Sequence, residues 1–155
     1  MKHLTLTCPV AELTDDELSP DDRELIRRAR EATDNSYAPY SRFRVGAAVR
    51  LADGTIICGA NQENAAFPSG LCAERTALFY AHASNPRTPA ATLAVAARDE
   101  QGFTPLPVTP CGSCRQVMAE LQKASGRPLR VLLHGTKCNW LIEDARHLLP
   151  LAFDL

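Results

Sequence analysis

The chain has 155 residues, of which 45% are hydrophobic, and its formal net charge is -1. This length is sufficient for one domain with a hydrophobic core. No basic stripe is present, which argues against binding to nucleic acid, and no long apolar run or signal-peptide pattern appears. We therefore expect a soluble, cytoplasmic protein with no membrane partner.

The first 18 residues are expected to form an N-terminal arm, and residues 19–155 a single domain. Leu4 and Leu6 alternate with polar residues, which suits an edge strand or a loose segment. The sequence Ser19-Pro20-Asp21-Asp22 predicts a helix start, because serine can cap the helix and proline fits its first position. This helix is expected to run to about residue 33.

Three aromatic residues lie in a predicted loop over residues 35–43, namely Tyr37, Tyr40 and Phe43. The loop could pack onto the core, or it could form a wall against a flat aromatic ligand. In the second case Phe43, directly before the next strand, is the best-placed ring. The residues themselves leave both interpretations open.

Two strands, over residues 45–51 and 55–60, are predicted to form a hairpin, because Asp53-Gly54 between them is a turn signal. Four polar residues, Asn61 to Asn64, follow the second strand. They suit a loop before a helix. They could also bind a polyhydroxy group, because a carboxylate accepts hydrogen bonds from hydroxyls and an amide both donates and accepts them.

The rest of the chain alternates between helices and strands. This order predicts a three-layer α/β/α domain with a mixed five-stranded sheet, whose β-α-β portion is parallel with right-handed crossovers. Two helix starts would lie at the carboxyl ends of the preceding strands, where open α/β sheets bind ligands. The predicted elements are helices over residues 72–84, 111–125 and 142–148, and strands over residues 90–97, 129–133 and 137–141.

Two cysteine motifs begin the helices at residues 72 and 111. Cys111 and Cys114 are three residues apart and project from one face of a helical turn. Together with Cys72 they could hold one zinc ion tetrahedrally and leave the fourth position to water. Glu74 cannot share a helix face with Cys72, so it is free to move protons to and from that water. A similar pattern, with a later Pro-Cys-x-x-Cys, occurs in zinc deaminases.

The surroundings of the motifs favour a metal site. A helix N-terminus stabilises a thiolate. Arg75 and Arg115 each follow a proposed ligand and could donate hydrogen bonds to sulfur, which would offset the negative charge of three thiolates. The alternative is a redox pair or two buried cysteines. The remaining cysteines, Cys8, Cys58 and Cys138, lack ligand spacing.

In combination, these residues resemble the small, homotetrameric cytidine deaminases. The similarity runs from about Tyr37 to the end of the chain. It rests on five motifs: Pro39-Tyr40-Ser41 with Phe43 and Val45-Gly46-Ala47; Asn61-Gln62-Glu63-Asn64-Ala65; Cys72-Ala73-Glu74-Arg75-Thr76-Ala77; Pro110-Cys111-Gly112-Ser113-Cys114-Arg115-Gln116; and Leu148-Leu149-Pro150 with Phe153.

The resemblance implies a role for each matching residue. Cys72, Cys111 and Cys114 would bind one zinc ion per subunit, and Glu74 would be the proton shuttle. The backbone at Ala73 would contact the polar edge of the base.

The resemblance also implies how the nucleoside is held. Asn61 and Glu63 would bind the ribose hydroxyls, and Phe43 would stack on the pyrimidine. Pockets would be shared between the subunits of a homotetramer, with Phe153 closing the pocket of a neighbour. Phe67 stands where family members often have tyrosine, so any hydrogen bond from a hydroxyl at this position is lost.

The implied activity is the zinc-dependent hydrolysis of cytidine and 2′-deoxycytidine to uridine and 2′-deoxyuridine, with release of ammonia. Zinc-bound water would attack C4 of the base, with Glu74 handling the protons. One alternative is a deaminase of another substrate, either a modified aminopyrimidine nucleoside such as blasticidin S or a base in single-stranded nucleic acid. Another is a non-catalytic protein that binds zinc or a nucleoside.

Overall fold

A computed structural model describes residues 1–155 of the protein. Its helices are α1 (Pro20–Ala32), α2 (Ala73–Ser84) and α3 (Gly112–Ser125). Its strands are β1 (Ala11–Leu13), β2 (Arg44–Leu51), β3 (Ile56–Ala60), β4 (Ala90–Asp99), β5 (Gly102–Phe103), β6 (Arg130–His134) and β7 (Asn139–Ile142).

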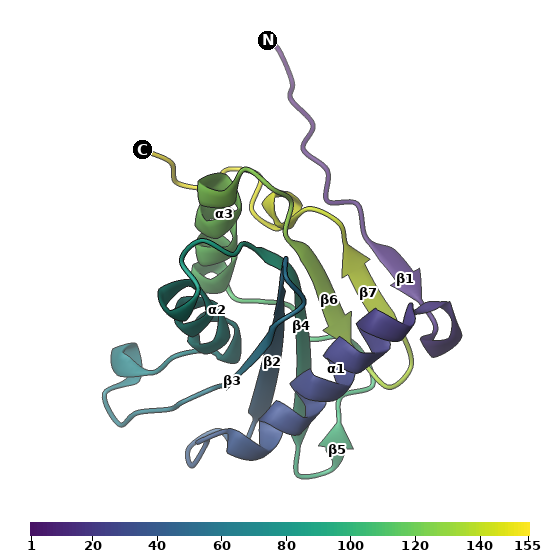
Figure 1. The fold of residues 1–155 in the computed structure, drawn as a ribbon, viewed down its shortest axis with the longest axis vertical. Coiled ribbons are helices and arrows are strands. Elements are labelled where there is room, and N and C mark those ends of the chain that lie inside the picture. The colour runs from purple at the N-terminus through teal and green to yellow at the C-terminus, as the bar shows by residue number, and fades with distance from the viewer.

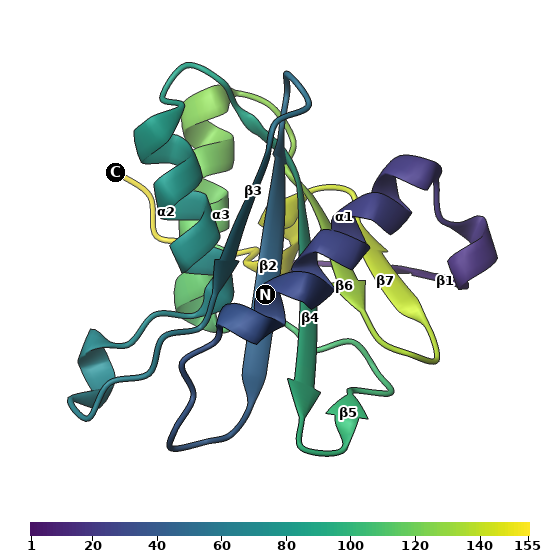
Figure 2. The same ribbon diagram turned by 60° about the horizontal axis from the view of Figure 1, so that its bottom comes forward.

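The strands form one mixed sheet in the order β1-β7-β6-β4-β2-β3, with β5 paired to β4. Helix α1 crosses one face of this sheet, and α2 and α3 lie together on the other (Figure 1, and turned in Figure 2). β4 and β6 are parallel, whereas the other pairs are antiparallel. The predicted three-layer α/β/α architecture is confirmed.

The prediction of five strands was wrong, because the sheet has seven. All five predicted strands are present, and β1 and β5 are additional. These two strands have only three and two residues. Such lengths are too short to show the alternation of polar and apolar residues by which a strand is recognised.

The predicted final helix is also shorter than expected. β7 continues to Ile142, and only Ala145–Leu148 forms a helical turn, of the 3-10 type. The side chain of Asp144 accepts a hydrogen bond from the Arg146 amide and so caps this turn. Of the predicted helix, β7 takes only Ile142, and Glu143 and Asp144 connect the strand to the helical turn.

Part of the N-terminal arm belongs to the sheet. β1 pairs antiparallel with β7, and Leu18 is buried. The indole of Trp140 donates a hydrogen bond to Glu12 across this pair. Residues 1–10 are exposed and form no helix or strand. The division at residue 18 stays a prediction. No helix in the structure is long and apolar enough to cross a membrane.

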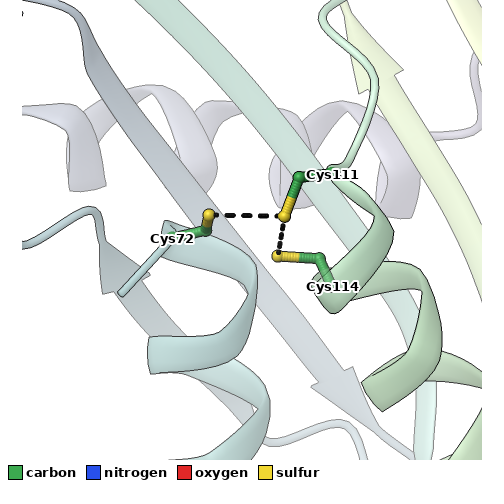
Figure 3. Close-up of side chains that lie close together, drawn as sticks. All are labelled: Cys72, Cys111 and Cys114. Atoms are coloured by element: carbon green, nitrogen blue, oxygen red, sulfur yellow. Dashed lines mark hydrogen bonds between the residues drawn. The ribbon is translucent and has the colours of Figure 1, made fainter. Parts of the chain in front are cut away.

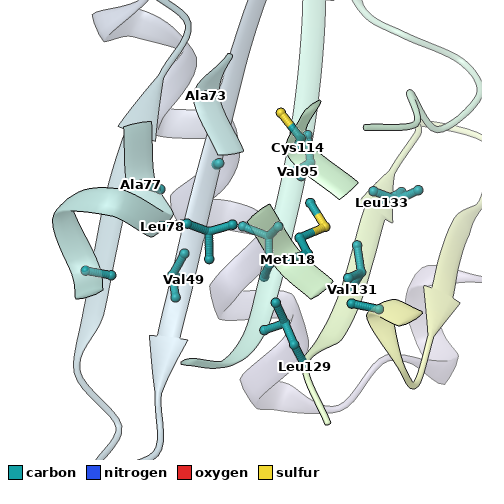
Figure 4. Packing of buried hydrophobic residues seen from close by; sticks show 14 of the residues in the cluster. Val49, Ala73, Ala77, Leu78, Val95, Cys114, Met118, Leu129, Val131 and Leu133 are labelled. Carbon is teal, nitrogen blue, oxygen red and sulfur yellow. The ribbon is translucent and has the colours of Figure 1, made fainter. Parts of the chain in front are cut away.

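The main core lies between the sheet and the helices α2 and α3, as Figure 4 shows. Leu78 from α2 and Met118 from α3 are fully buried there against Val49 and Val95 of the sheet. This packing fixes the two helices beside each other, so that their N-terminal ends meet.

Candidate active site

The three predicted cysteine ligands converge at the N-terminal ends of α2 and α3 (Figure 3). Cys72 is the N-cap residue of α2 and Cys111 is the N-cap residue of α3, each with an extended backbone. Neither thiol is used to cap its helix. Both are therefore free to face Cys114, which lies in the first turn of α3.

The spacing of the sulfur atoms fits one zinc ion. Cys111 Sγ lies 3.7 Å from Cys72 Sγ and 3.5 Å from Cys114 Sγ, and all three sulfurs lie within 4.8 Å of one another. Thiolates bound to zinc at ~2.3 Å in a tetrahedron are ~3.8 Å apart. Three protein ligands leave a fourth position open, which is the pattern of catalytic rather than structural zinc.

The charge around Cys72 favours a thiolate. The neighbouring Cys114 thiol and the Arg75 guanidinium lower the pKa of Cys72 to about 5. Arg75 Nη2 lies 3.9 Å from Cys72 Sγ, as predicted for a guanidinium that offsets thiolate charge. The neighbouring Cys72 thiolate and burial raise the pKa of Cys114.

Arg115 acts differently from the expectation. Its guanidinium makes no hydrogen bond to sulfur. Its Nε donates to the Pro110 carbonyl at 2.8 Å, and its Nη1 donates to the Leu148 carbonyl at 3.0 Å. Arg115 therefore fixes the backbone directly before Cys111, and it ties this backbone to the C-terminal segment.

Glu74 lies beside the cysteine cluster and lines the adjoining cavity. Its side chain is buried, with the residue only 5% exposed. Burial raises the pKa of its carboxyl group, and the charge of Cys72 adds to this rise. A raised pKa makes a carboxyl group a better proton acceptor than an ordinary glutamate, and general acid/base catalysis uses such a group.

A cavity of about 670 Å³ opens in front of Glu74 and two of the cysteines. This volume is within the range of ~300–1,000 Å³ that is usual for small-molecule sites. Its walls combine apolar side chains with the polar loop after β3. Among the residues that line it are Tyr40, Val45, Asn61, Glu63, Phe67, Leu71, Cys72, Glu74, Val95, Val108, Thr109 and Cys111.

Asn61 and Glu63 both lie in this wall and also hold the surrounding loops. Asn61 Oδ1 accepts from the Val45 amide at 2.8 Å, and its Nδ2 donates to the Phe43 carbonyl at 2.9 Å. Glu63 accepts from the Tyr40 amide at 2.8 Å. Hydrogen bonds from Ser41 and Tyr40 lower the pKa of Glu63, so it is a carboxylate with acceptor capacity left for a ligand.

Of the other predicted substrate-binding residues, one lines the cavity and three do not. Phe67 lines the cavity and packs edge-to-face on Tyr40, with ring centroids 6.0 Å apart. Phe43 and Ala73 do not line it: Phe43 is half-buried and Ala73 is fully buried at the first turn of α2. Phe153 is 71% exposed on the C-terminal tail, away from this cavity. The roles of these three stay predictions.

Sequence reasoning missed several apolar residues of the wall. Leu71 and Val108 line the cavity, as do Val95 of β4 and Thr109. Leu71 directly precedes Cys72, and Val108 and Thr109 precede the Pro110 motif. Their position next to the motifs was the available signal.

Comparison with known proteins agrees with this geometry. Residues 19–125 match the family described as cytidine and deoxycytidylate deaminase zinc-binding region. The cytidine deaminase of Sporosarcina psychrophila is 42% identical over 133 residues, which cover 86% of this chain and 91% of that protein. That of Halalkalibacterium halodurans is 50% identical over 101 residues, which cover 65% of this chain and 72% of that protein.

Solved structures show the same fold. The crystal structure of cytidine deaminase from Burkholderia pseudomallei aligns with a TM-score of 0.72 at 42% identity, over 84% of this chain and 98% of that one. Cytidine deaminase from Mycobacterium tuberculosis aligns with a TM-score of 0.66 at 32% identity, over 86% of this chain and 97% of that one. The family match spans the three clustered cysteines and the buried Glu74, and the chain belongs to the zinc-binding cytidine and deoxycytidylate deaminase family.

Proposed function

We propose that the protein catalyses the hydrolytic deamination of cytidine and 2′-deoxycytidine to uridine and 2′-deoxyuridine, with release of ammonia. The observation that carries this proposal is the buried Glu74 carboxyl group beside three clustered cysteines, at the floor of a nucleoside-sized cavity. A purely structural zinc site would have no use for an open ligand position or for an acid/base group next to it.

The chain's own groups divide the reaction between them. Cys72, Cys111 and Cys114 would hold the zinc ion, which, when bound, would lower the pKa of water toward ~7. Glu74 removes a proton from the attacking water as oxygen adds to C4 of the base. It delivers this proton to N3 and then passes the second proton of the attacking oxygen to the amino group, which leaves as ammonia when the C4–N bond breaks.

The polar wall of the cavity supports a nucleoside with a free sugar. The Glu63 carboxylate accepts a hydrogen bond from a ribose hydroxyl, and Asn61 contributes the amide hydrogen that its bonds within the chain leave over. Phe43 stacks on the pyrimidine, and the Ala73 backbone binds its polar edge. Both residues are close in sequence to the cavity wall, since Phe43 is two residues before Val45 and Ala73 directly follows Cys72.

The cavity in a single chain is open on one side, which supports an oligomer with shared pockets. Cys111 is exposed, and Phe67 at the mouth of the cavity is 77% exposed. Ligand sites usually bury ~70–90% of a small ligand. The protein forms a homotetramer in which Phe153 of one subunit closes the cavity of another.

The test is the ultraviolet spectrum of cytidine incubated with zinc-loaded protein. Conversion to the spectrum of uridine, with one ammonia released per cytidine, is expected. A protein that only binds a nucleoside would raise its melting temperature with cytidine and release no ammonia. Failure with cytidine and turnover of a modified aminopyrimidine nucleoside would replace the proposed substrate.

A second test separates the roles of the site residues. Glu74→Gln should keep one zinc ion per chain and lose activity by about 10²–10⁴-fold, because the variant cannot transfer protons. Turnover at the wild-type rate in this variant would refute the role of Glu74 as proton shuttle.

A further inference from the structure

The C-terminal tail is bound to the same helix that carries two of the metal ligands. Near the start of α3, Arg115 donates to the Leu148 carbonyl at 3.0 Å. Gln116 then binds the main chain of Phe153, and Lys123 binds the Asp154 carboxylate and the Leu155 carbonyl. The tail therefore follows α3 from the metal centre outward.

Gln116 makes the most specific of these contacts. Its Nε2 donates to the Phe153 carbonyl at 2.9 Å, and its Oε1 accepts from the Phe153 amide at 3.1 Å. One carboxamide thus engages both main-chain groups of one residue, which fixes the orientation of that residue as well as its position. Lys123 is seven residues, or about two turns and ~10.5 Å, farther along the same face of α3, and it holds the chain end.

This clamp presents the Phe153 ring to the outside of the molecule. The residue is 71% exposed, although its backbone is held at both polar groups. Phe153 is also absent from the wall of the cavity in its own chain. An exposed aromatic ring on a fixed backbone is suited to docking, because little conformational freedom is lost when it binds.

We propose that Gln116 is a positioning residue, which holds the tail on α3 so that Phe153 reaches the cavity of a second copy of this chain. The inference rests on the proposed function for the role of Phe153. The clamp itself rests only on the contacts of Gln116 and Lys123. Gln116 does not line the cavity, and its side chain bonds Phe153 and none of the cysteines, so it acts through Phe153.

The first experiment tests the clamp without any substrate. Hydrogen exchange of the C-terminal residues 149–155 is measured for the wild type and for Gln116→Ala. Alanine keeps the helix intact, since it is the best helix former. The exchange of the Phe153 amide should become at least about tenfold faster, because its acceptor is removed. Unchanged exchange would overturn the proposal, whatever the protein does to cytidine.

The second experiment compares KM with kcat for cytidine. Gln116→Ala should raise KM about tenfold, with kcat and zinc content within about twofold of the wild type, because only the closing of the pocket is impaired. Gln116→Glu keeps the acceptor but cannot donate to the Phe153 carbonyl, and should change KM in the same direction. Glu120→Ala is the matched control, since Glu120 is exposed on α3 and its side chain makes no hydrogen bond. A fall of kcat in proportion to zinc would overturn the proposal.

The third experiment tests transfer between copies. Gln116→Ala chains, which have Glu74, are assembled with Glu74→Gln chains, which have the intact clamp. The KM of the mixture should return toward the wild-type value, because active sites then receive Phe153 from clamped neighbours. A KM that stays at the Gln116→Ala value would refute sharing. Lack of any cytidine turnover by the wild type would instead refute the proposed function and leave the exchange result to decide on the clamp.

Discussion

At Gly59 of β3 the sheet lies directly against the backbone of the active-site helix α2. A Cβ atom at this position would lie 2.5 Å from the Ala77 amide nitrogen and 3.0 Å from the Ala73 carbonyl oxygen. Ordinary contact begins at 3.4 Å, so the shorter distance lies 0.9 Å inside it. Both partners are backbone atoms of α2, so no side-chain rotation can relieve the overlap. Gly59→Ala therefore has to move α2 by about 1 Å.

The displacement would act on the chemistry directly. Ala73 stands between Cys72 and Glu74, so α2 would carry both residues away from Cys111 and Cys114 on α3. Overpacking of this kind costs about 1–3 kcal/mol of the free energy of unfolding. A misplacement of ~1 Å in an active site can lower kcat by about 10²-fold. We expect both losses in Gly59→Ala, together with weaker zinc binding.

Two other glycines provide matched controls. A Cβ atom at Gly46 of β2 would lie 2.1 Å from the Ala29 carbonyl oxygen, so Gly46→Ala strains α1, on the face of the sheet that carries no active-site residue. A Cβ atom at Gly112 would meet nothing within 4 Å. None of the three glycines has a positive φ angle, so substitution by alanine adds no backbone strain. Each variant therefore tests only whether there is room for the Cβ atom. Gly46→Ala should lose stability but keep kcat, and Gly112→Ala should lose neither.

The measurements are the free energy of unfolding from urea titration, zinc content by mass spectrometry, and kcat at saturating cytidine per folded, zinc-loaded chain. The reasoning would be refuted if Gly59→Ala kept the stability and kcat of the wild type. It would also be refuted if Gly46→Ala, corrected for its folded fraction, lost as much kcat as Gly59→Ala.

Three further predictions concern the metal centre and a buried histidine. Cys114→Ala should bind zinc at least about tenfold more weakly and lose activity in parallel, as measured by competition with a chelator; full zinc occupancy would exclude Cys114 as a ligand. Arg75→Ala should lower zinc affinity or activity by about 10–100-fold, because Arg75 contacts the Cys72 thiolate, whereas exposed Arg87→Ala should have no effect. Burial lowers the pKa of His134, so the unfolded chain takes up a proton below pH ~6.5 that the folded chain does not, and stability falls as the pH drops through this value. At pH 5.5 this loss is at most about 1.4 kcal/mol, and His134→Gln should lack it in urea titrations at pH 7.5 and 5.5; an equal pH dependence in both proteins would contradict the argument.

The cysteine cluster could be predicted from the sequence because its residues lie in two short motifs with fixed spacing. The three-residue spacing of Cys111 and Cys114 fixes their geometry within one helical turn. The pairing of Cys72 with Glu74 supplies a ligand and an acid/base group within three residues. That the two motifs lie side by side depends on the fold. The alternation of helices and strands was sufficient to predict this proximity.

The features that sequence reasoning missed depend on contacts between distant segments. The Leu148 carbonyl that Arg115 binds lies 33 residues away. Asp15, which accepts a hydrogen bond from buried Asn139, lies 124 residues away. Asn139 in turn bonds His134, and this chain of polar groups joins the N-terminal segment to the sheet beside β1. No local pattern marks such contacts, and this is why the position and pairing of β1 and the role of Arg115 were not foreseen.

The hydrogen bonds of Asn61 and Glu63 bear on how substrate recognition should be tested. Asn61 bonds the backbone of Phe43 and Val45, where the loop enters β2, and Glu63 holds the Tyr40 amide in this loop. Under the proposed function, the residues that bind the sugar also hold the cavity wall in place, so the site is formed before the ligand arrives. Loss of activity in Asn61→Ala therefore cannot be equated with the loss of one ribose contact. Binding of nucleosides that lack single hydroxyls to the unaltered protein separates recognition from scaffolding, because the wall then stays intact.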